Sequence, residues 1–466
     1  MSESLRVIVV GAGVAGLATA WLIAERARQS ERPLQLRVFE SRSVAGGSTR
    51  TDQQDGFLCE WGPNGFLDNE PATLKLVEQL GLTDRLQRSS DASAHRFIFH
   101  GGRLREVPSS PPAFLKSDIV PLPAKLRMAG ELFVARGPAD DDESVYDFGC
   151  RRLGPEFANL LLDPMVTGIF AGDVRQLSLR AVFPKMAEME QTYGGLFRAL
   201  FAKTWHAKLG GTPTGGPGGP RGTLHTFRDG MGELTTTLAD QLGDAVELEA
   251  AVRAVERQDD GFVVHTQHGL HPADAVVIAC PSYAAASMVA GLSPNTARAL
   301  DDIWHAPVDV VCFGFGAQDL RRPVDGFGVL IPRTEGIRTL GTLLSDRIFP
   351  GQAPEGQRLL RTLIGGAHDP SIGKLSLDDL EATVERDLDQ LFGLDRPPCF
   401  RRSFRHAQGI AQYTIGHLDR VARTERLEEE HRGLYFTGAS YRGVSVNGCI
   451  KDAFLVRDRL WEAVGG

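Results

Sequence analysis

The sequence predicts a mixed α/β (α+β) fold with a strand-rich part and a helical part, and three stretches of the chain indicate it. Residues 5–40 have the pattern of a strand, a glycine turn, a helix and a second strand. Residues 108–200 are mainly helix-like, with helices predicted over 124–135, 144–153 and 156–162, and lack the alternation of a strand. Short β-like runs between turns return at about residues 245–280. A chain of 466 residues is long enough for about three domains.

The first strand and its glycine turn form a Rossmann-like, dinucleotide-binding pattern. Leu5–Val10 is a continuous apolar run, as in a strand buried on both faces. A G-x-G-x-x-G turn follows, then a predicted helix over 17–28 and a strand over 34–40. Gly11 would form the tight turn, Gly13 would let a pyrophosphate approach, and Gly16 would let helix and strand pack. Glu40 would accept hydrogen bonds from a ribose. The candidate contacts here are Gly11, Gly13, Val14, Ala15, Gly16, Glu40, Ser41 and Arg42.

The next two glycine-containing segments favour FAD over NAD as the cofactor. Gly46-Gly47-Ser48 and the nearby Arg50 offer close backbone approach and charge for a longer cofactor. The turn around residues 62–64 is suited to lie against a flat ring. Further candidate cofactor contacts are therefore Gly46, Gly47, Ser48, Gly62, Pro63 and Asn64.

Composition and the spacing of cysteines and histidines argue against several classes of protein. A formal net charge of −8 argues against a nucleic-acid partner, because phosphate binding needs a concentrated basic surface. The six cysteines contain no C-x-x-C pair, which is typical of reduced cytosolic thiols. His265, His268 and His271 flank a predicted hairpin without a completing ligand, so no metal site is expected. The sequence has no predicted signal peptide or spanning segment, and we expect a cytoplasmic protein.

Several ordered segments carry a family resemblance. They are Gly62-Pro63-Asn64, the run Pro164–Asp173, the run Asp325–Pro332, Gln412-Tyr413 with Gly416-His417, and Gly438–Tyr441 with Gly443-Val444. With these motifs the whole chain resembles the flavoprotein family of amine oxidases, phytoene desaturases and protoporphyrinogen oxidases, and is most similar to the last branch. Two departures lie near the expected flavin: Ala411 stands where the family usually has Pro, and Gly448 where it usually has Asp.

The resemblance implies a discontinuous FAD-binding domain, a β-rich substrate domain and a helical insertion. The FAD-binding domain would take residues 1–90, 241–305 and 425–466. The substrate domain would take residues 91–107, 201–240 and 306–424, and the helical domain residues 108–200. The mix of Phe114, Leu115, Ile119 and Leu122 with Lys116, Lys125 and Arg127 suits peripheral contact with anionic lipid, although an ordinary amphipathic surface fits it as well. The oligomeric state, a homodimer included, stays open.

The resemblance also implies an activity: FAD-dependent oxidation of a porphyrinogen by molecular oxygen, with release of hydrogen peroxide. Arg96 would face a substrate carboxylate, and Phe327, Leu330 and Leu363 would enclose the macrocycle. Gly168 would bring its carbonyl close to the reacting carbon. Val252 would meet the adenine through its backbone. Val446 and Asn447, at the start of the last helix, would direct its positive end at the flavin.

Four other functions stay open. Protoporphyrinogen IX is the favoured substrate, and coproporphyrinogen III is the nearest alternative because both fit the same fold and chemistry. An amine oxidase or a carotenoid desaturase is disfavoured by the 164–173 and 325–332 segments. A GDP-dissociation-inhibitor-like binding protein, which performs no redox chemistry, is disfavoured by Gly46-Gly47 and by the 62–64 turn.

Overall fold

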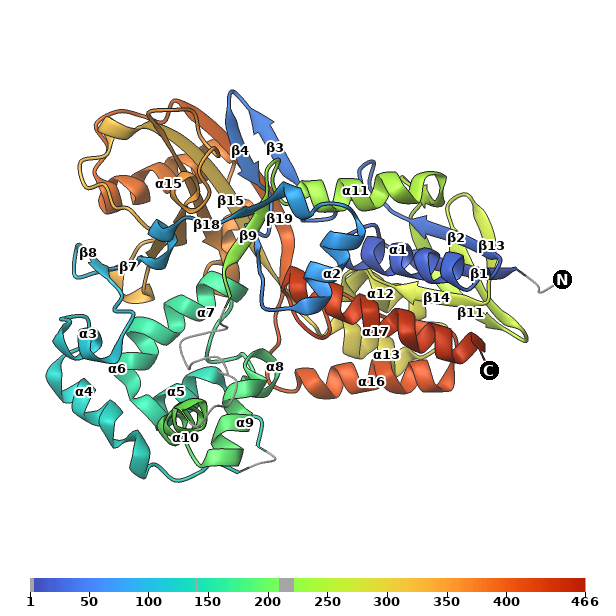
Figure 1. Cartoon of the computed structure of the whole chain (residues 1–466), viewed down its shortest axis with the longest axis horizontal. Helices are drawn as coiled ribbons and strands as arrows, with labels where there is room; N and C mark the ends of the chain where they lie inside the picture. The colour runs from blue at the N-terminus through green and yellow to red at the C-terminus, as the bar shows by residue number, and fades with distance from the viewer. Residues whose placement is uncertain (1–3, 139–140, 209–221, 466) are drawn as a thin grey trace.

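The computed structural model describes residues 4–138, 141–208 and 222–465. Figure 1 shows three parts: a sheet covered by helices, which carries both termini, a second sheet with helix α15, and a layer of helices beneath that second sheet. The mixed α/β fold expected from the sequence is confirmed.

The first sheet is parallel, with strand order β10-β2-β1-β14-β20. It joins distant parts of the chain, because β14 and β20 come more than two hundred residues after β1. Helix α1 packs against α11 and α17 on one face. On the other face lie α12 and a three-stranded antiparallel sheet. The bounds are β1 (Leu5–Val10), α1 (Val14–Gln29), β2 (Leu34–Phe39), α11 (Gly232–Leu242), β10 (Val246–Glu247), β11 (Val252–Gln258), β12 (Gly261–Thr266), β13 (Gly269–Ala273), β14 (Ala275–Ile278), α12 (Ser282–Val289), α13 (Pro294–Asp301), α16 (His417–Glu430), β20 (Leu434–Phe436) and α17 (Val446–Gly465).

The second sheet has seven strands in the order β19-β15-β18-β17-β16-β7-β8. Leu380, Val384 and Leu388 of helix α15 bury one face of it. Part of the other face packs on Phe57, close to the 62–64 turn. The bounds are β7 (Arg96–His100), β8 (Arg103–Glu106), β15 (His305–Gly316), β16 (Gly328–Leu330), β17 (Thr339–Leu344), α14 (Ser345–Ile348), β18 (Gln357–Gly365), α15 (Leu377–Phe392) and β19 (Phe400–Ala411).

Short elements connect the two sheets. Strands β3 and β4 form a hairpin that leads to the 62–64 turn, and β5, β9 and β6 form a small antiparallel sheet. The bounds are β3 (Thr51–Gln54), β4 (Phe57–Glu60), β5 (Phe66–Leu67), α2 (Pro71–Gln79), β6 (Leu86–Arg88) and β9 (Leu224–Phe227). The hairpin thus leads to the 62–64 turn and packs on the seven-stranded sheet.

The helical layer differs from the sequence prediction in three details. The helix predicted over 124–135 ends at Ala129 and continues as one 3-10 turn, because Gly130 follows. The helix predicted over 156–162 is one short α-turn and a π-helical turn that run into α7. Ile119, predicted on the surface, is buried against Ile98 and Ala124. The bounds are α3 (Pro111–Lys116), α4 (Leu122–Ala129), α5 (Val145–Leu153), α6 (Pro155–Phe157), α7 (Asp163–Phe170), α8 (Leu179–Val182), α9 (Pro184–Tyr193) and α10 (Leu196–Lys208).

Three of the expected domain boundaries fall inside helices. The boundary at 240/241 lies within α11, which continues to Leu242. The boundary at 200/201 lies within α10, which continues to Lys208. The boundary at 424/425 lies within α16, which packs on β20 and α13.

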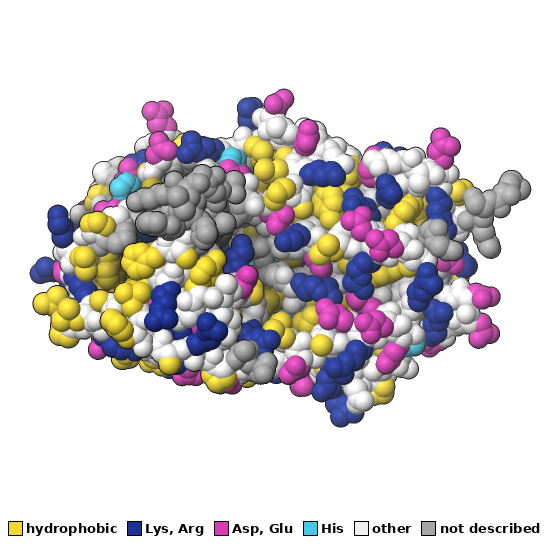
Figure 2. Space-filling view, turned by 60° about the horizontal axis from the view of Figure 1, so that its bottom comes forward, with side chains coloured by type: hydrophobic (Ala, Val, Ile, Leu, Met, Phe, Trp, Pro, Cys, Tyr) yellow, Lys and Arg dark blue, Asp and Glu magenta, His cyan; other side chains and the backbone are white. Residues whose placement is uncertain are grey.

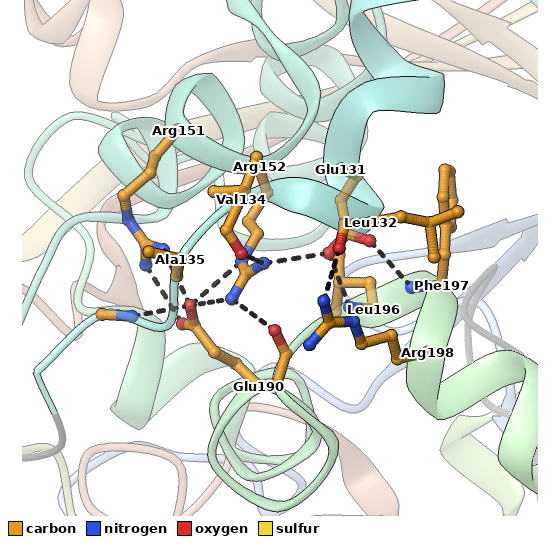
Figure 3. Close-up of polar contacts among 12 residues, drawn as sticks. Glu131, Leu132, Val134, Ala135, Arg151, Arg152, Glu190, Leu196, Phe197 and Arg198 are labelled. Carbon is orange, nitrogen blue, oxygen red and sulfur yellow. Dashed lines mark hydrogen bonds and ion pairs between the residues drawn. The ribbon is translucent and has the colours of Figure 1, made fainter.

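A buried ionic network holds the helical layer together (Figure 3). Arg152, fully buried, pairs with the carboxylates of Glu131 and Glu190. Glu131 also accepts the N–H groups of Leu196 (2.7 Å) and Phe197 (3.1 Å), at the start of α10. A buried charge must be paired and hydrogen-bonded to be tolerated. The network therefore fixes the start of α10 against the 3-10 turn after α4.

Candidate cofactor and substrate site

The glycine turn after β1 has the geometry of a pyrophosphate cradle. A Cβ atom built on Gly16 would lie 1.9 Å from the carbonyl oxygen of Gly11, so only glycine lets helix α1 start this close to the turn. A Cβ on Gly13 would project into open space before the N-terminus of α1, where free N–H groups gather. Val14 and Ala15 form the first turn of that helix. These residues fit the pyrophosphate of FAD.

The second glycine loop lies directly beside the first. The N–H of Gly46 donates to the carbonyl oxygen of Ala12 (2.7 Å), and Gly47 packs on the Cα atom of Gly13. Ser48 is exposed beside them. Two loops that are more than thirty residues apart in the sequence thus form one surface, as expected for an extended cofactor.

Glu40 closes this surface at the end of β2. Its buried carboxylate accepts the N–H of Ala12 (2.9 Å) and the N–H of Arg42 (2.9 Å), and Ser41 Oγ lies 3.2 Å away. A carboxylate can accept about four hydrogen bonds, so these contacts leave capacity for a ribose hydroxyl. Ser41 and Arg42 are exposed at the rim.

The turn at Gly62-Pro63-Asn64 lies against the same loops. A Cβ on Gly62 would lie 2.5 Å from the carbonyl oxygen of Ser48, so the two segments touch backbone to backbone. Among the described residues, neither the Asn64 amide nitrogen nor its oxygen has a hydrogen-bond partner, although both atoms are buried. An unpaired buried polar group costs about 1–3 kcal/mol. This amide is therefore where a bound flavin is expected to supply partners.

The start of α17 offers backbone groups and not side chains. Both polar atoms of the Asn447 side chain bind other protein groups. Its Oδ1 accepts from Thr73 Oγ1 (2.8 Å), and its Nδ2 donates to the carbonyl oxygen of Leu67 (2.8 Å). Val446 is buried. Ser445 caps the helix by accepting the N–H of Gly448 (3.0 Å). Val446 and Asn447 can therefore reach a cofactor only through the N–H groups of the first turn.

The structure also places the predicted adenine contact, Val252, and the two positions that depart from the family pattern, Ala411 and Gly448. Val252 is buried at the start of β11, next to a register shift in its pairing with β12, so part of its backbone is outside the regular ladder. Ala411 ends β19 opposite His305. Gly448, in the first turn of α17, would place a Cβ 3.2 Å from the carbonyl oxygen of Gly443.

On the substrate side, Arg96 and Phe327 come together. Strands β7 and β16 run parallel with Arg96 opposite Gly328, and the Arg96 guanidinium carbon lies 5.4 Å from the centre of the Phe327 ring. Arg96 is exposed, and Phe327 is half-buried. The pair places one cation beside an aromatic surface.

Leu330, Leu363 and Gly168 form a second group. Leu330 of β16 and Leu363 of β18 both pair with Gly341 of β17, so the two leucines flank a position without a side chain. Helix α7 crosses here, and a Cβ on Gly168 would lie 3.0 Å from Leu330 Cδ2. Both leucines are half-buried. The structure thus brings Gly168 to an apolar surface built by three strands.

Two ion pairs of Arg333, which the sequence did not predict, hold α7 against the sheet. Arg333, just after β16, pairs with Asp163 at the first residue of α7 (3.0 Å) and with Asp173 beyond its end (2.7 Å). His368 lies beside Asp163 and Thr167, and burial lowers its pKa to about 4, so it is neutral at pH 7. The sequence signal was the position of Asp173 at the end of the 164–173 motif and of Arg333 directly after the 325–332 motif.

The fold and the site define a flavoprotein oxidoreductase of the dinucleotide-binding class. Residues 14–456 match the family described as flavin containing amine oxidoreductase. The chain is 32% identical to the chloroplastic protoporphyrinogen oxidase of Nicotiana tabacum, with 98% of this chain and 86% of that protein covered. It is 28% identical to the coproporphyrinogen III oxidase of Bacillus subtilis (strain 168), with 95% of each covered. The structure of a protein from Exiguobacterium sp. 255-15, provisionally assigned as a protoporphyrinogen oxidase, superposes with a TM-score of 0.83 at 25% identity, covering 100% of both chains.

The chain therefore belongs to the flavin-containing amine oxidoreductase family, and it is an FAD-dependent oxidoreductase. The expected family, enzyme class and cofactor are confirmed. The expected roles of individual residues remain predictions.

Proposed function

We propose that the protein catalyses the six-electron oxidation of protoporphyrinogen IX to protoporphyrin IX in haem biosynthesis, with molecular oxygen as acceptor and hydrogen peroxide as product. The observation that carries the proposal is the position of one exposed arginine, Arg96, beside the half-buried ring of Phe327. A porphyrinogen is a broad apolar ring with carboxylates at its edge. Such a ligand needs an apolar surface with a few basic anchors. The similarity to plant protoporphyrinogen oxidases supports the same substrate class.

Each of the predicted site residues would have its own role in binding the cofactor or the substrate. When bound, FAD supplies the redox chemistry: it accepts hydride and passes electrons to oxygen. Arg96 would hold a propionate carboxylate by paired hydrogen bonds and so orient the ring. Leu330 and Leu363 would contact the macrocycle and exclude water. The missing side chain at Gly168 would leave room for the reacting carbon beside α7. The first turn of α17 would place positive charge near the flavin.

The test is to supply both porphyrinogens to the purified yellow protein. Product is followed by porphyrin fluorescence, and peroxide is measured in the same samples. We expect protoporphyrin and stoichiometric peroxide, with a higher kcat/KM for protoporphyrinogen IX than for coproporphyrinogen III. A protein that carries FAD and oxidises neither substrate contradicts the proposal.

Coproporphyrinogen III oxidation is the second candidate. It is supported by the similarity to the Bacillus subtilis enzyme, which covers 95% of both chains. Coproporphyrinogen carries more carboxylates than protoporphyrinogen, and further cations near Arg96 would favour it. Arg105 of β8 and Arg333 lie in that part of the molecule, but each is paired with acids, Arg105 with Asp118 and Arg333 with Asp163 and Asp173. This pairing favours the substrate with fewer carboxylates.

We also propose peripheral contact of the helical layer with the cytoplasmic face of a membrane. Within the described residues, no helix is long and apolar enough to cross a bilayer. Figure 2 shows apolar side chains gathered among basic ones over the helical layer. Exposed large apolar side chains of α3, α4, the 3-10 turn after α4 and α10, together called the apolar patch, are Leu115, Leu122 (68% exposed), Leu126, Phe133 (88% exposed) and Phe201. Such a mix suits an anionic lipid surface.

The ionic network of Figure 3 supports this proposal because it fixes two parts of the patch. Phe133 lies in the 3-10 turn that contains Glu131, and Phe201 lies on α10, whose start Glu131 caps. Arg198 also donates to the carbonyl oxygen of Leu132 (2.8 Å). The two phenylalanines are therefore attached to one rigid base, which lowers the entropy cost of binding a surface.

Vesicle sedimentation tests the membrane proposal. We expect the protein to bind vesicles that contain anionic lipid, and salt to weaken that binding. Replacing Leu122, Leu126 and Phe133 together by Ser should abolish it. Leu270→Ser, at a position 66% exposed on β13, is the matched control and should leave it intact. Equal binding by the triple variant and the control would contradict the proposal.

A further inference from the structure

Two side chains of the seven-stranded sheet bind three consecutive carbonyl oxygens of the segment that leads into the 62–64 turn. Arg361 of β18 donates from Nε to the carbonyl oxygen of Glu60 (3.0 Å) and from Nη2 to that of Gly62 (2.5 Å). Between these two, the carbonyl oxygen of Trp61 lies 2.9 Å from Nε2 of His406 on β19. Each of the three carbonyl groups that precede Pro63 and Asn64 is thus bound by a side chain of β18 or β19.

This arrangement sets the direction of the free backbone groups. A peptide group is planar, so the N–H of Gly62 points away from the carbonyl of Trp61 and hence away from His406. Within the part of the chain that the structure describes, this N–H has no hydrogen-bond acceptor. The Asn64 amide, two residues on, is also without a partner there. The turn therefore presents unused polar groups, while the carbonyl oxygens of residues 60–62 are bound by Arg361 and His406.

The two holding side chains differ in charge. Arg361 is buried, and among the described residues no carboxylate lies within ion-pair distance of it. Burial of His406 lowers its pKa, so the imidazole is neutral at pH 7 and donates without a charge. Burial raises the pKa of the neighbouring Glu60 carboxyl to about 7, which leaves Arg361 incompletely compensated. A buried charge in a low-dielectric surrounding acts over a longer range than an exposed one.

We propose that Arg361 and His406 are positioning residues of the cofactor site, and that Arg361 also provides the positive charge that favours reduced, anionic flavin. This inference rests on the placement of the flavin ring at the Gly62–Asn64 turn. His406 and Arg361 both hold the turn, so both contribute to FAD affinity. Only Arg361, through its positive charge, binds the reduced cofactor more tightly than the oxidised one.

The experiment compares holoproteins of the wild type and five variants: Arg361→Met, Arg361→Lys, His406→Leu, His406→Gln and Arg358→Met. Arg358 is the matched control, because it is also a buried arginine of β18 but binds Asp346 (2.9 Å) and not the turn. For each protein, FAD release on dilution gives the dissociation constant, and a redox titration gives the two-electron midpoint potential. Neither readout needs a porphyrinogen.

The expected results separate the effect of the hydrogen bonds to the turn from the effect of the positive charge of Arg361. Arg361→Met should weaken FAD binding at least tenfold and weaken reduced FAD a further tenfold, which lowers the midpoint potential by about 30 mV. Arg361→Lys keeps the charge, so affinity should fall while the potential stays at the wild-type value. His406→Leu should weaken both redox states equally, His406→Gln should restore affinity because it keeps a donor, and Arg358→Met should change neither readout.

Several outcomes would overturn the inference. An unchanged midpoint potential in Arg361→Met removes the charge role, and wild-type FAD affinity in Arg361→Lys and His406→Leu removes the holding role. Should Arg361→Met fail to fold, the lysine variant still decides whether the turn is held. Failure to oxidise any porphyrinogen would leave these readouts intact, whereas wild-type protein that binds no FAD would remove both proposals together.

Discussion

The guanidinium of Arg96 lies over the ring of Phe327, with 5.4 Å between Cζ and the ring centre. The contact depends on parallel pairing between β7 and β16, two strands from distant parts of the chain. An arginine held against an aromatic face loses less conformational freedom when it binds a carboxylate. The pair therefore prepares one fixed anchor at the edge of an apolar surface.

Replacing Arg96 by Ala should raise KM far more than it lowers flavin content. A hydrogen bond to a charged group is worth about 1.5–3 kcal/mol, so KM should rise roughly tenfold to a hundredfold. Steady-state kinetics with FAD content from absorbance provide the measurement. Arg103→Ala, at an exposed position on the neighbouring β8, is the control. An unchanged KM would remove Arg96 from the substrate site.

A methyl group at position 168 should slow the reaction without loss of FAD. The new Cβ would lie 3.0 Å from Leu330 Cδ2, tighter than ordinary contact, and would fill space beside the apolar surface. We expect kcat/KM to fall about tenfold, while the melting temperature holds because alanine favours the helix by about 1 kcal/mol. The Gly168→Ala, Leu330→Ala double variant should recover part of the activity. Strict additivity of the two changes would mean that the residues do not act together.

Removing Arg333 should loosen α7. Asp163 is nearly buried and would lose its ion pair, while Arg333 itself is one-third exposed, so Arg333→Gln should cost about 1–3 kcal/mol of unfolding free energy. We expect a raised KM as well, because Gly168 would no longer be fixed against Leu330. Urea unfolding and kinetics check both effects. Arg338→Gln, which breaks a pair with Asp369 outside α7, should leave KM unchanged.

Glu60 should make stability depend on pH. Burial raises the pKa of its carboxyl from the ordinary 4.5 to about 7 in the folded protein. Between pH 4.5 and 7 the unfolded chain releases this proton more readily than the folded one, so this contribution to stability is present at pH 4.5 and lost as the pH rises to about 7. Glu60→Gln should flatten the slope and be more stable at pH 8 by roughly 2–3 kcal/mol.

Urea midpoints at pH 5, 6 and 8 provide the measurement for Glu60. Glu78→Gln, at an exposed position on α2, is the control and should keep the wild-type slope. An unchanged slope in Glu60→Gln would mean that the carboxyl is ionised throughout this range.

Short sequence patterns predicted the elements whose structure depends on a few neighbouring residues. The apolar run of β1 and the glycines after it gave a strand, a turn and a helix because each requirement is contained in a few residues. Ser144 and Ser376, each before a helical pattern, cap α5 and α15 as such serines usually do. Family resemblance supplied Arg96, Leu330 and Leu363, which no periodicity singles out.

Contacts between distant segments could not be predicted in the same way. The pairing of Arg333 with two aspartates depends on how α7 crosses the sheet. Arg361 gave a local signal, a single charge inside the apolar run 359–364, but its partners at the 60–62 turn lie three hundred residues away. Asn447 was predicted as a cofactor contact, and only tertiary structure shows that its side chain binds α2 and β5.

The order of strands in the parallel sheet has a consequence for biosynthesis on the ribosome. Its central strand β1 is synthesised before its neighbour β14, and much later come β20, which pairs with β14, and α17, which lies on α1. The nascent polypeptide must therefore keep its apolar N-terminal run from aggregating for most of translation. A cradle that needs both the glycine turn after β1 and the first turn of α17 cannot retain its prosthetic group until α17 has been made, which makes coenzyme capture a late step of maturation.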